Sequence, residues 1–450
     1  MKIFQIIALL LGGYTNSLGH EPFPAGKLIE RVVCRTDATQ TYALYIPIKG
    51  NKGSLPVVYL FDPHGDGTLP LKKYRSLADI YGFILVGSNN SKNGNDWQVT
   101  GNIWQHLWDD TKSRLNIDDK RVYTCGFSGG AKVASYVALQ HRGIKGVIAG
   151  GAGLPDGVPA GNFGFSFTIL AGEGDMNLTD LVATNNDLNL THTRHRIIIF
   201  EGKHEWAPMN VMNLAFAGLQ FDAMRDGIVP KDKGYIEAYV AKSKTRLNDY
   251  SNTGQLIMAH QECTLSSLLL DGVTDEANWF KQRLTLLQKN PQYQQQRQEQ
   301  EFLLSREQNI KAGYMQHFQQ EDRQYWTTVI HDLETKAAVK SVEKAMYQRL
   351  LAYLSLAFYS LSNRLIIAGE NNGARYFTDL YKLADPTNSE AWYFSAVLHA
   401  REKDIQHAES DLLKAVGNGF RDKGRLALQP EFKTFDMSRV TAAIQRAQSR

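Results

Sequence analysis

Short β-rich runs alternate with helix-like stretches along the chain from Lys27 to about Gly227. This alternation is typical of an α/β sheet. It predicts eight strands, at residues 28–34, 41–46, 57–61, 83–87, 121–125, 144–149, 165–170 and 197–200, and helices between them at residues 71–79, 103–115, 131–140, 178–184 and 209–224. Little sequence separates the strands ending at Ala149 and starting at Phe165, so we expect no large lid there.

The strand signals stop after Pro230, and the rest of the chain is polar and helical in pattern. A chain of 450 residues is too long for one compact α/β domain without additions. We therefore predict an α/β domain over residues 20–229 and a separable all-helical domain over residues 230–450. The Gln-rich segment from Pro291 to Phe318 places apolar residues on one helix face, which predicts a long amphipathic helix, with disorder as the alternative.

A repeat pattern near residues 340–425 is similar to degenerate tetratricopeptide repeats. Small and large residues recur there at the spacings of a helix pair that must stack to bury a core. Tyr381 and Phe420 depart from the pattern, and an unrelated helical bundle is the alternative. The matching positions are Ala374, Pro386, Trp392, Ala396, Ala408, Leu412 and Ala415.

The amino terminus has the pattern of a cleavable secretory signal over residues 1–19. Lys2 precedes an apolar run from Ile3 to Leu11, and small residues stand shortly before His20. The run is well short of the roughly 20 residues that span a bilayer, which disfavours the alternative of a retained anchor. The pattern predicts export to the periplasm or the cell exterior and no stable membrane span.

Charge and cysteine content exclude several classes of function. The net charge is only +4, from 50 basic and 46 acidic residues, without a basic run interleaved with aromatic residues, so we expect no nucleic-acid partner. The three cysteines lack the spacing of metal ligands, and we expect neither a metal nor a cofactor. Cys125 lies on a predicted strand, where we expect a buried thiol rather than a nucleophile.

The segment from Gly126 to Gly130 has the sequence G-x-S-x-G between a predicted strand and a predicted helix. This pattern is typical of a nucleophile elbow, a sharp turn that needs small residues on both sides of the serine. Ser128 is therefore the candidate nucleophile, and a plain glycine-rich turn is the alternative.

A serine hydroxyl needs a base, and the base works best beside a carboxylate that fixes its tautomer. In the elbow architecture these partners follow the serine in the order acid, then histidine. His204 comes just after the last strand and fits the base, whereas the other histidines after Ser128 end a helix, precede that strand or lie in the helical region. Asp175 follows the preceding strand and fits the acid; Glu173, Asp180 and Asp156 are its rivals.

The developing oxyanion needs preorganised N–H donors. Gly129, directly after the serine, supplies one of them. The other comes from the glycine-rich loop after the strand at 57–61, at Gly65 or Asp66. We treat His64 and Trp206 as candidate substrate-binding residues.

These residues together resemble the α/β-hydrolase superfamily, and in particular secreted esterases of the polyhydroxybutyrate depolymerase, feruloyl esterase and dienelactone hydrolase groups. The resemblance rests on 63–65, 126–130, Asp175, His204 and 206–208, and covers roughly residues 27–227. It implies an eight-stranded, mostly parallel sheet and attack on an ester carbonyl through an acyl-enzyme. True dienelactone hydrolases have a cysteine nucleophile, which is absent at Ser128.

The leading functional hypothesis is a secreted serine hydrolase, carboxylesterase-like, that cleaves a small-molecule or polymeric ester. A secreted serine peptidase is an alternative because the same residues cleave amides. A non-catalytic binding protein is a second alternative, in which the helical domain recruits a protein partner. The complete set of nucleophile, base and acid favours the enzyme.

Overall fold

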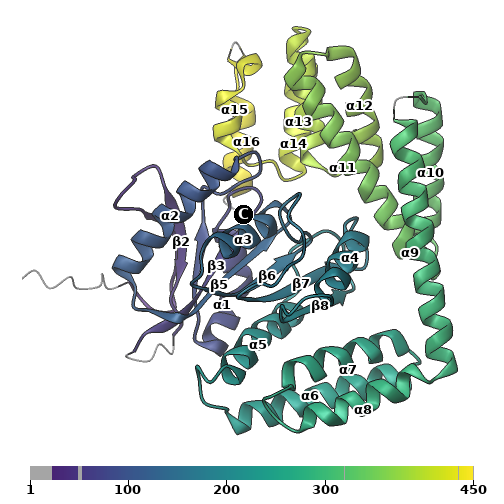
Figure 1. The fold of residues 1–450 in the computed structure, drawn as a ribbon. Coiled ribbons are helices and arrows are strands. Elements are labelled where there is room, and N and C mark those ends of the chain that lie inside the picture. Colours follow the sequence, from purple (N-terminus) through teal and green to yellow (C-terminus); the bar gives the residue numbers. More distant parts are fainter. Residues whose placement is uncertain (1–22, 49–52, 319, 434, 449–450) are drawn as a thin grey trace, which may run out of the picture. The chain divides into compact units, whose positions relative to one another are not determined.

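A computed structural model describes residues 23–48, 53–318, 320–433 and 435–448; the predicted signal segment, residues 1–19, lies outside them. One eight-stranded sheet has the order β1-β2-β4-β3-β5-β6-β7-β8 (Figure 1). The strands are β1 (Leu28–Val33), β2 (Thr41–Tyr45), β3 (Leu55–Phe61), β4 (Ile84–Ser88), β5 (Ile117–Phe127), β6 (Ile144–Gly150), β7 (Ser166–Gly172) and β8 (His195–Phe200). All eight predicted strands are therefore present.

The sheet is mostly parallel, as the sequence predicts. β3 pairs in parallel with β4 and with β5, and β5 pairs in parallel with β6. At the amino-terminal edge, β1 pairs with β2 and β2 pairs with β4 in the antiparallel sense. The central strands β3, β4, β6 and β7 are almost wholly buried, which fits a parallel sheet covered on both faces.

Helices cover both faces of this sheet. Successive strand residues point to opposite faces, and the β3–β5 register pairs Tyr59 with Thr124. Tyr59 packs edge-on against Trp104 of α2, and the Thr124 hydroxyl donates to Ala134 O of α3. On the other face, Tyr123 of β5 packs near Phe83. An aromatic ring of α5 also packs near Phe83, so α5 covers this face. The helices of this region are α1 (Thr68–Tyr81), α2 (Trp97–Arg114), α3 (Gly129–Gln140), α4 (Leu178–Leu188) and α5 (Met209–Arg225).

The described residues after Pro230 form helices joined by short connections and contain no strand, as predicted. The Gln-rich segment forms one continuous helix, α9, whose first turn is capped by the Asn290 side chain and begins with Pro291. The helices are α6 (Lys233–Asn252), α7 (Leu256–Leu270), α8 (Glu276–Gln288), α9 (Pro291–His317), α10 (Arg323–Ala338), α11 (Lys344–Ala368), α12 (Asn371–Ala384), α13 (Ser389–Arg401), α14 (Ile405–Gly417), α15 (Lys423–Leu428), a 3-10 turn (Pro430–Phe432) and α16 (Ser438–Gln448).

The helices α11 to α14 share one apolar core. Small residues let neighbouring helices approach closely, and the alanines at the predicted repeat positions are almost fully buried. Tyr381, which departs from the repeat pattern, is buried as well, and Trp392 donates its indole N–H to Pro386 O at 2.8 Å. The relationship to tetratricopeptide repeats stays a prediction. The buried alanines at these positions are Ala374, Ala396, Ala408 and Ala415.

The described residues pack into two compact units that interleave along the chain. One unit contains the residues up to 168 with 191–195 and 208–230, and the second contains 169–190, 196–207 and the residues from 231 onward. The ends of β7 and β8, with the loops that follow them, therefore pack in the same unit as the C-terminal helices. The domain boundary at 229/230 stays a prediction about folding units.

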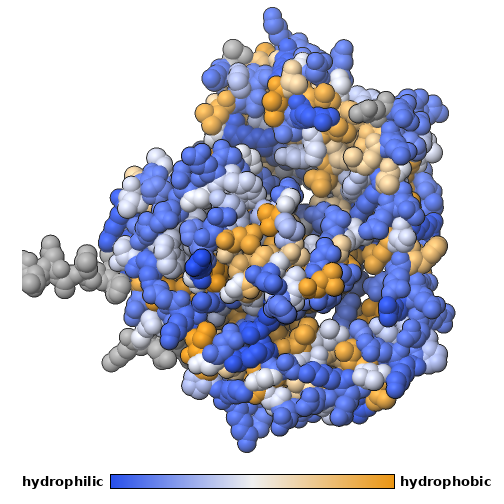
Figure 2. Space-filling view, in the orientation of Figure 1, coloured by the Kyte–Doolittle hydropathy of each residue, from blue (hydrophilic) through white to orange (hydrophobic). Residues whose placement is uncertain are grey.

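Apolar side chains on the surface do not form one large patch on the face in view. Figure 2 shows a mostly hydrophilic face with small separate apolar areas. Among the described residues, α11 is the one helix long and apolar enough to cross a membrane by length and composition. Its Leu350, Leu354 and Phe358 are buried in the helical core, so these apolar residues are used in helix packing. The absence of a stable membrane span stays a prediction.

Candidate active site

Ser128 lies in a strained turn between β5 and α3. Its φ of 53° and ψ of −123° fall in a region that residues with a side chain rarely adopt. Its N–H donates to Gly150 O at the end of β6, at 2.8 Å, and its carbonyl accepts from the Ala131 N–H at 2.9 Å. The side chain is half-buried. This is the backbone that the G-x-S-x-G pattern predicts, with the hydroxyl at the carboxyl end of a central strand.

Two of the elbow glycines are enforced by close backbone contacts. A Cβ atom on Gly126 would lie 2.0 Å from Gly130 O, and one on Gly130 would lie 2.0 Å from Phe61 O. Carbon atoms essentially never approach main-chain oxygens this closely. The pattern therefore reflects the packing of α3 onto β3 and β5 as well as the turn itself.

Alanine at Gly126 or Gly130 should lower the free energy of unfolding by about 1–3 kcal/mol or more, because the backbone must shift to admit the methyl group. Gly143→Ala is the matched control, since a Cβ atom there meets nothing within 4 Å. Urea unfolding measures all three variants. Equal stability of the Gly130 and Gly143 variants would contradict the packing described here.

Asn93 is a residue of the site that the sequence reasoning missed. Its Oδ1 lies 1.8 Å from where a Cβ atom on Gly129 would be, so the amide side chain sits against the elbow. Its N–H donates to Pro63 O at 2.8 Å, which links the segment after β4 to the loop after β3. The run of glycine and asparagine after β4 was the signal that could have found it.

The loop after β3 contains the predicted second oxyanion donor. Gly65 has a φ of +74°, but its N–H donates to Asp62 O at 3.1 Å and closes a turn. The Asp66 carboxylate accepts from the Thr68 N–H at 3.1 Å, which fixes the start of α1. Of the two predicted donors, the Asp66 N–H is thus the better candidate. The His64 side chain is 82% exposed, so it is accessible to a ligand.

Asp175 and His204 form a close pair on the loops after β7 and β8. His204 Nδ1 lies 3.0 Å from Oδ1 and 3.0 Å from Oδ2 of Asp175. The Asp175 side chain is 1% exposed and that of His204 is 20% exposed. Asp175 Oδ1 also accepts from the Asn177 N–H at 2.9 Å. A buried carboxylate against one ring nitrogen leaves the other nitrogen able to accept a proton.

Main-chain hydrogen bonds join these two loops. The Glu173 N–H donates to Phe200 O and the Gly174 N–H donates to Gly202 O, each at 2.8 Å. A Cβ atom on Gly172 would lie 2.4 Å from Lys203 O, so a glycine is needed where the loops cross. The backbone thereby continues the contact between β7 and β8 into the segments that carry Asp175 and His204.

The three rival carboxylates have other surroundings. The Asp156 carboxylate is 88% exposed and pairs with Lys132 at 2.6 Å. Asp180 lies in the first turn of α4, where a negative charge favours the helix, and is exposed. Glu173 is partly buried on the acid loop. Of the four predicted carboxylates, that of Asp175 lies within hydrogen-bond distance of the His204 ring.

Glu173 has a perturbed titration. Burial raises its pKa above the ordinary value, the nearby Glu201 carboxylate adds to this, and the Arg349 guanidinium partly offsets it. The folded protein therefore holds this proton more tightly than the unfolded chain does.

Protonation of Glu173 should make the stability pH-dependent. Its contribution is fully present below the pKa of the unfolded chain and is lost as the pH rises through the raised pKa of the folded protein. Glu173→Gln, which stays neutral, should remove that part of the dependence. Urea midpoints over the weakly acidic range measure it, with the exposed Glu237→Gln as control. Identical pH profiles for the wild type and the Glu173 variant would exclude this role.

Three tryptophans of the α/β region differ in exposure. Trp206, the candidate substrate-binding residue beside His204, is largely buried. Trp104 belongs to the core under α2, whereas Trp97 is exposed and stacks on Tyr136 with ring centroids 4.7 Å apart. The role of Trp206 stays a prediction.

The three thiols are buried and unpaired. Burial raises the pKa of Cys34 and of Cys263 to about 12, and it raises that of Cys125 as well. A thiol held protonated is a poor nucleophile. Across the described ranges there is no group of three or more His, Cys, Asp or Glu side chains that could hold a metal ion.

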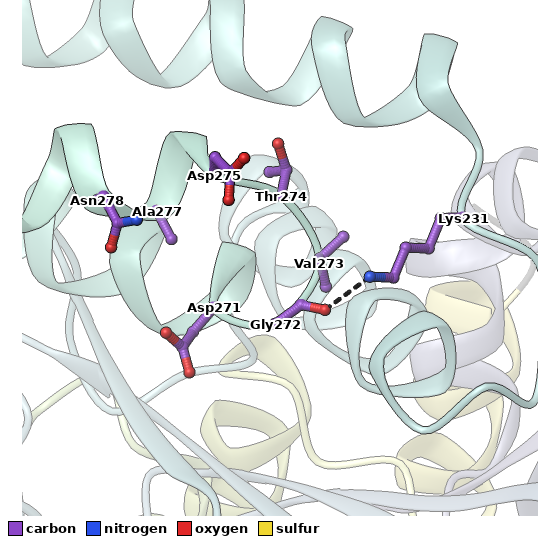
Figure 3. Close-up of a pocket in the computed structure, with 8 residues that line it drawn as sticks. All are labelled: Lys231, Asp271, Gly272, Val273, Thr274, Asp275, Ala277 and Asn278. Carbon is purple, nitrogen blue, oxygen red and sulfur yellow. Dashed lines mark hydrogen bonds between the residues drawn. The ribbon is translucent and has the colours of Figure 1, made fainter.

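A surface hollow of about 240 Å³ lies at the turn between α7 and α8. Figure 3 shows the Lys231 ammonium pointing at the Gly272 carbonyl, to which it donates at 2.8 Å. The remaining lining comes from residues 271, 273–275, 277 and 278. None of the predicted site residues lines it.

Two proteins are similar in sequence to part of this chain. The protein named "Probable acetylxylan esterase A" of Aspergillus terreus is 24% identical over 186 residues, which cover 36% of this chain and 58% of that protein. Acetylxylan esterase A of Emericella nidulans is 23% identical over 175 residues, which cover 35% of this chain and 58% of that protein. The chain thus spans little more than half the length of the curated relatives it matches.

Among solved structures, the Pyrobaculum calidifontis esterase is similar over 45% of this chain and 85% of its own, at 13% identity and a TM-score of 0.36. A TM-score this low carries no argument about the fold beyond the strand order given above. No protein-family model matches the chain.

Proposed function

We propose that this chain, which has the sheet of the α/β hydrolases and is similar in sequence to acetylxylan esterases, is a serine hydrolase that cleaves carboxylic esters. Ser128 is the nucleophile, His204 the base and Asp175 the acid. The observation that carries the proposal is the buried Asp175 carboxylate, which lies 3.0 Å from His204 Nδ1 and follows a strained serine elbow in chain order.

In the proposed reaction, His204 Nε2 accepts the Ser128 proton as the hydroxyl oxygen attacks the ester carbonyl. The Asp175 carboxylate accepts the Nδ1–H hydrogen bond and stabilises the imidazolium. Collapse of the tetrahedral intermediate expels the alcohol, which takes the proton from His204, and leaves an acyl-enzyme. Water then attacks this ester with His204 again as base, and the carboxylic acid leaves from Ser128.

The oxyanion donors in this proposal are the N–H groups of Gly129 and Asp66. The Gly129 N–H begins α3, so the helix dipole adds to its donor strength. The Asn93 side chain lies against this same Gly129. This contact supports a role for the Asn93 side-chain amide in facing the substrate. His64 and Trp206 remain candidates for binding the substrate.

The substrate class follows from the similarity to acetylxylan esterases, so we propose a short acyl ester, small or on a polymer. The amino-terminal pattern supports export of the protein. The helical region is proposed as a site for a protein partner, and neither a cofactor nor a metal is part of the proposed reaction.

A panel of acetyl, longer acyl, aryl and hydroxycinnamoyl esters, with matching amides, tests the proposal on the full chain. We expect turnover of acetyl or other short acyl esters and covalent labelling of Ser128 by a fluorophosphonate. Preferential cleavage of the amides would assign a peptidase instead. Folded protein that neither turns over an ester nor takes up the label would refute the proposed chemistry and favour a binding protein.

A further inference from the structure

A buried carboxylate in the helical region holds two cations. Glu307 lies on α9, and its side chain is 0% exposed. Arg349 of α11 donates to Glu307 Oε2 at 2.6 Å, and the Lys311 ammonium, one turn along α9, lies 2.7 Å from Oε1. Buried charges of this kind persist where each is paired and hydrogen-bonded, because taking them out of water is costly.

Both cations also reach the loop after β7. Arg349 Nη1 donates to Glu173 O at 2.6 Å, and Lys311 Nζ donates to Met176 O at 2.8 Å. These two carbonyls stand on either side of Asp175 in the chain. The clamp, defined as Glu307, Arg349 and Lys311, therefore fixes the backbone at both sides of the proposed acid.

The clamp and the histidine loop bind different main-chain groups of the loop that carries Asp175. The amides of Glu173 and Gly174 donate to the end of β8 and the loop after it, whereas the carbonyls of Glu173 and Met176 accept from the clamp. Lys311 also lies 5.4 Å from the centre of the Tyr353 ring of α11, which favours one position of the ammonium. A loop bonded on both sides has little freedom to turn its carboxylate away from the imidazole.

We propose that α9 and α11 hold residues 173–176 through this clamp, so that Arg349 and Lys311 are positioning residues for the Asp175–His204 pair. The proposal rests on the proposed function for its effect on turnover, but not for its effect on the pair itself. It gives the C-terminal helices a part in the chemistry, although every proposed catalytic residue precedes Pro230. Removal of the helical region, which the sequence predicts to be separable, would then lower activity.

The test uses the full chain with Lys311→Met and Arg349→Lys. Methionine keeps the length of the stem without the donor, and lysine keeps the charge without the planar fork that reaches Glu307 and the loop together. Arg306→Gln is the matched control, because Arg306 joins α9 to Glu343, the residue that precedes α11, and makes no contact of the clamp's kind with the loop. Circular dichroism and unfolding midpoints establish that each variant is folded.

Three measurements report how each clamp variant changes the Asp175–His204 pair. We expect kcat on a short acyl ester to fall by about 10²-fold in each clamp variant, as small misplacements of catalytic groups do, with little change in KM. The downfield proton resonance of the His204 ring N–H bonded to Asp175 should broaden or shift. The amides of Glu173 and Gly174 should exchange with solvent faster. Arg306→Gln should match the wild type in all three.

The outcomes separate the two proposals. Folded clamp variants whose His204 proton, amide exchange and kcat equal those of the wild type would overturn the positioning role and leave the esterase proposal standing. If the wild type cleaves no ester, the proposed function fails, and the resonance and exchange measurements still decide whether the clamp holds the pair. Equal losses in Arg306→Gln would assign the effect to general loosening of the helices and also overturn the proposal.

Discussion

Replacing Ser128 with alanine should lower ester turnover by about 10⁴-fold or more, since losses of this size follow removal of one member of a unit that acts together. The fold should persist because Gly150 and Ala131 are bonded by the backbone of residue 128, not by its side chain. Steady-state kinetics with the background rate subtracted, together with the unfolding midpoint, measure both expectations.

The matched control for that variant is Ser76→Ala, an exposed serine on α1. It should leave turnover and labelling by the fluorophosphonate unchanged. Near-normal turnover in a folded Ser128→Ala variant would show that the nucleophile lies elsewhere, whatever the elbow geometry.

Asp175→Asn should lower kcat by about 10⁴-fold with little change in KM, because an amide in place of the carboxylate favours the wrong tautomer of His204. The shape of the side chain is kept, so the buried site that it occupies should remain packed. Turnover on a short acyl ester and the His204 ring proton signal measure the change.

The companion variants are Glu173→Gln and Asp156→Asn. Both should have mild effects, since Asp156 pairs with Lys132 at the surface and the clamp binds Glu173 through its backbone carbonyl. Should either prove more damaging than Asp175→Asn, the acid of the reaction belongs there.

Much of the fold could be predicted because its signals are local. Each predicted strand overlaps an observed one, since buried parallel strands are runs of apolar residues between turn signals. The errors lie at boundaries. β5 begins at Ile117 rather than Arg121, because Ile117 pairs with Leu55 of β3. The three polar residues at 118–120 hid this start from the apolar pattern. α2 begins at Trp97, where the Asp96 side chain caps the helix ahead of its apolar stretch.

The candidate site divides in the same way. The elbow could be predicted because glycine spacing and chain order are properties of one short segment. The clamp could not, because Lys311 and Arg349 lie 135 and 176 residues from the carbonyls they bind. Which of the four carboxylates contacts His204 depends on tertiary structure, since each of them follows or begins an element near the sheet. Asn93 was missed because its contact with Gly129 depends on how two loops fold back.

At residue 128, the strained backbone lowers the stability of the fold, while the proposed reaction needs a serine there. A φ of 53° with a ψ of −123° costs a residue with a Cβ atom about 1–3 kcal/mol, whereas glycine adopts it freely. Selection for heat resistance alone would therefore favour glycine there, which would raise the melting temperature and remove the proposed nucleophile. Directed-evolution libraries that screen this chain only for expression or thermal tolerance should be expected to lose the serine, so activity must be scored in the same round.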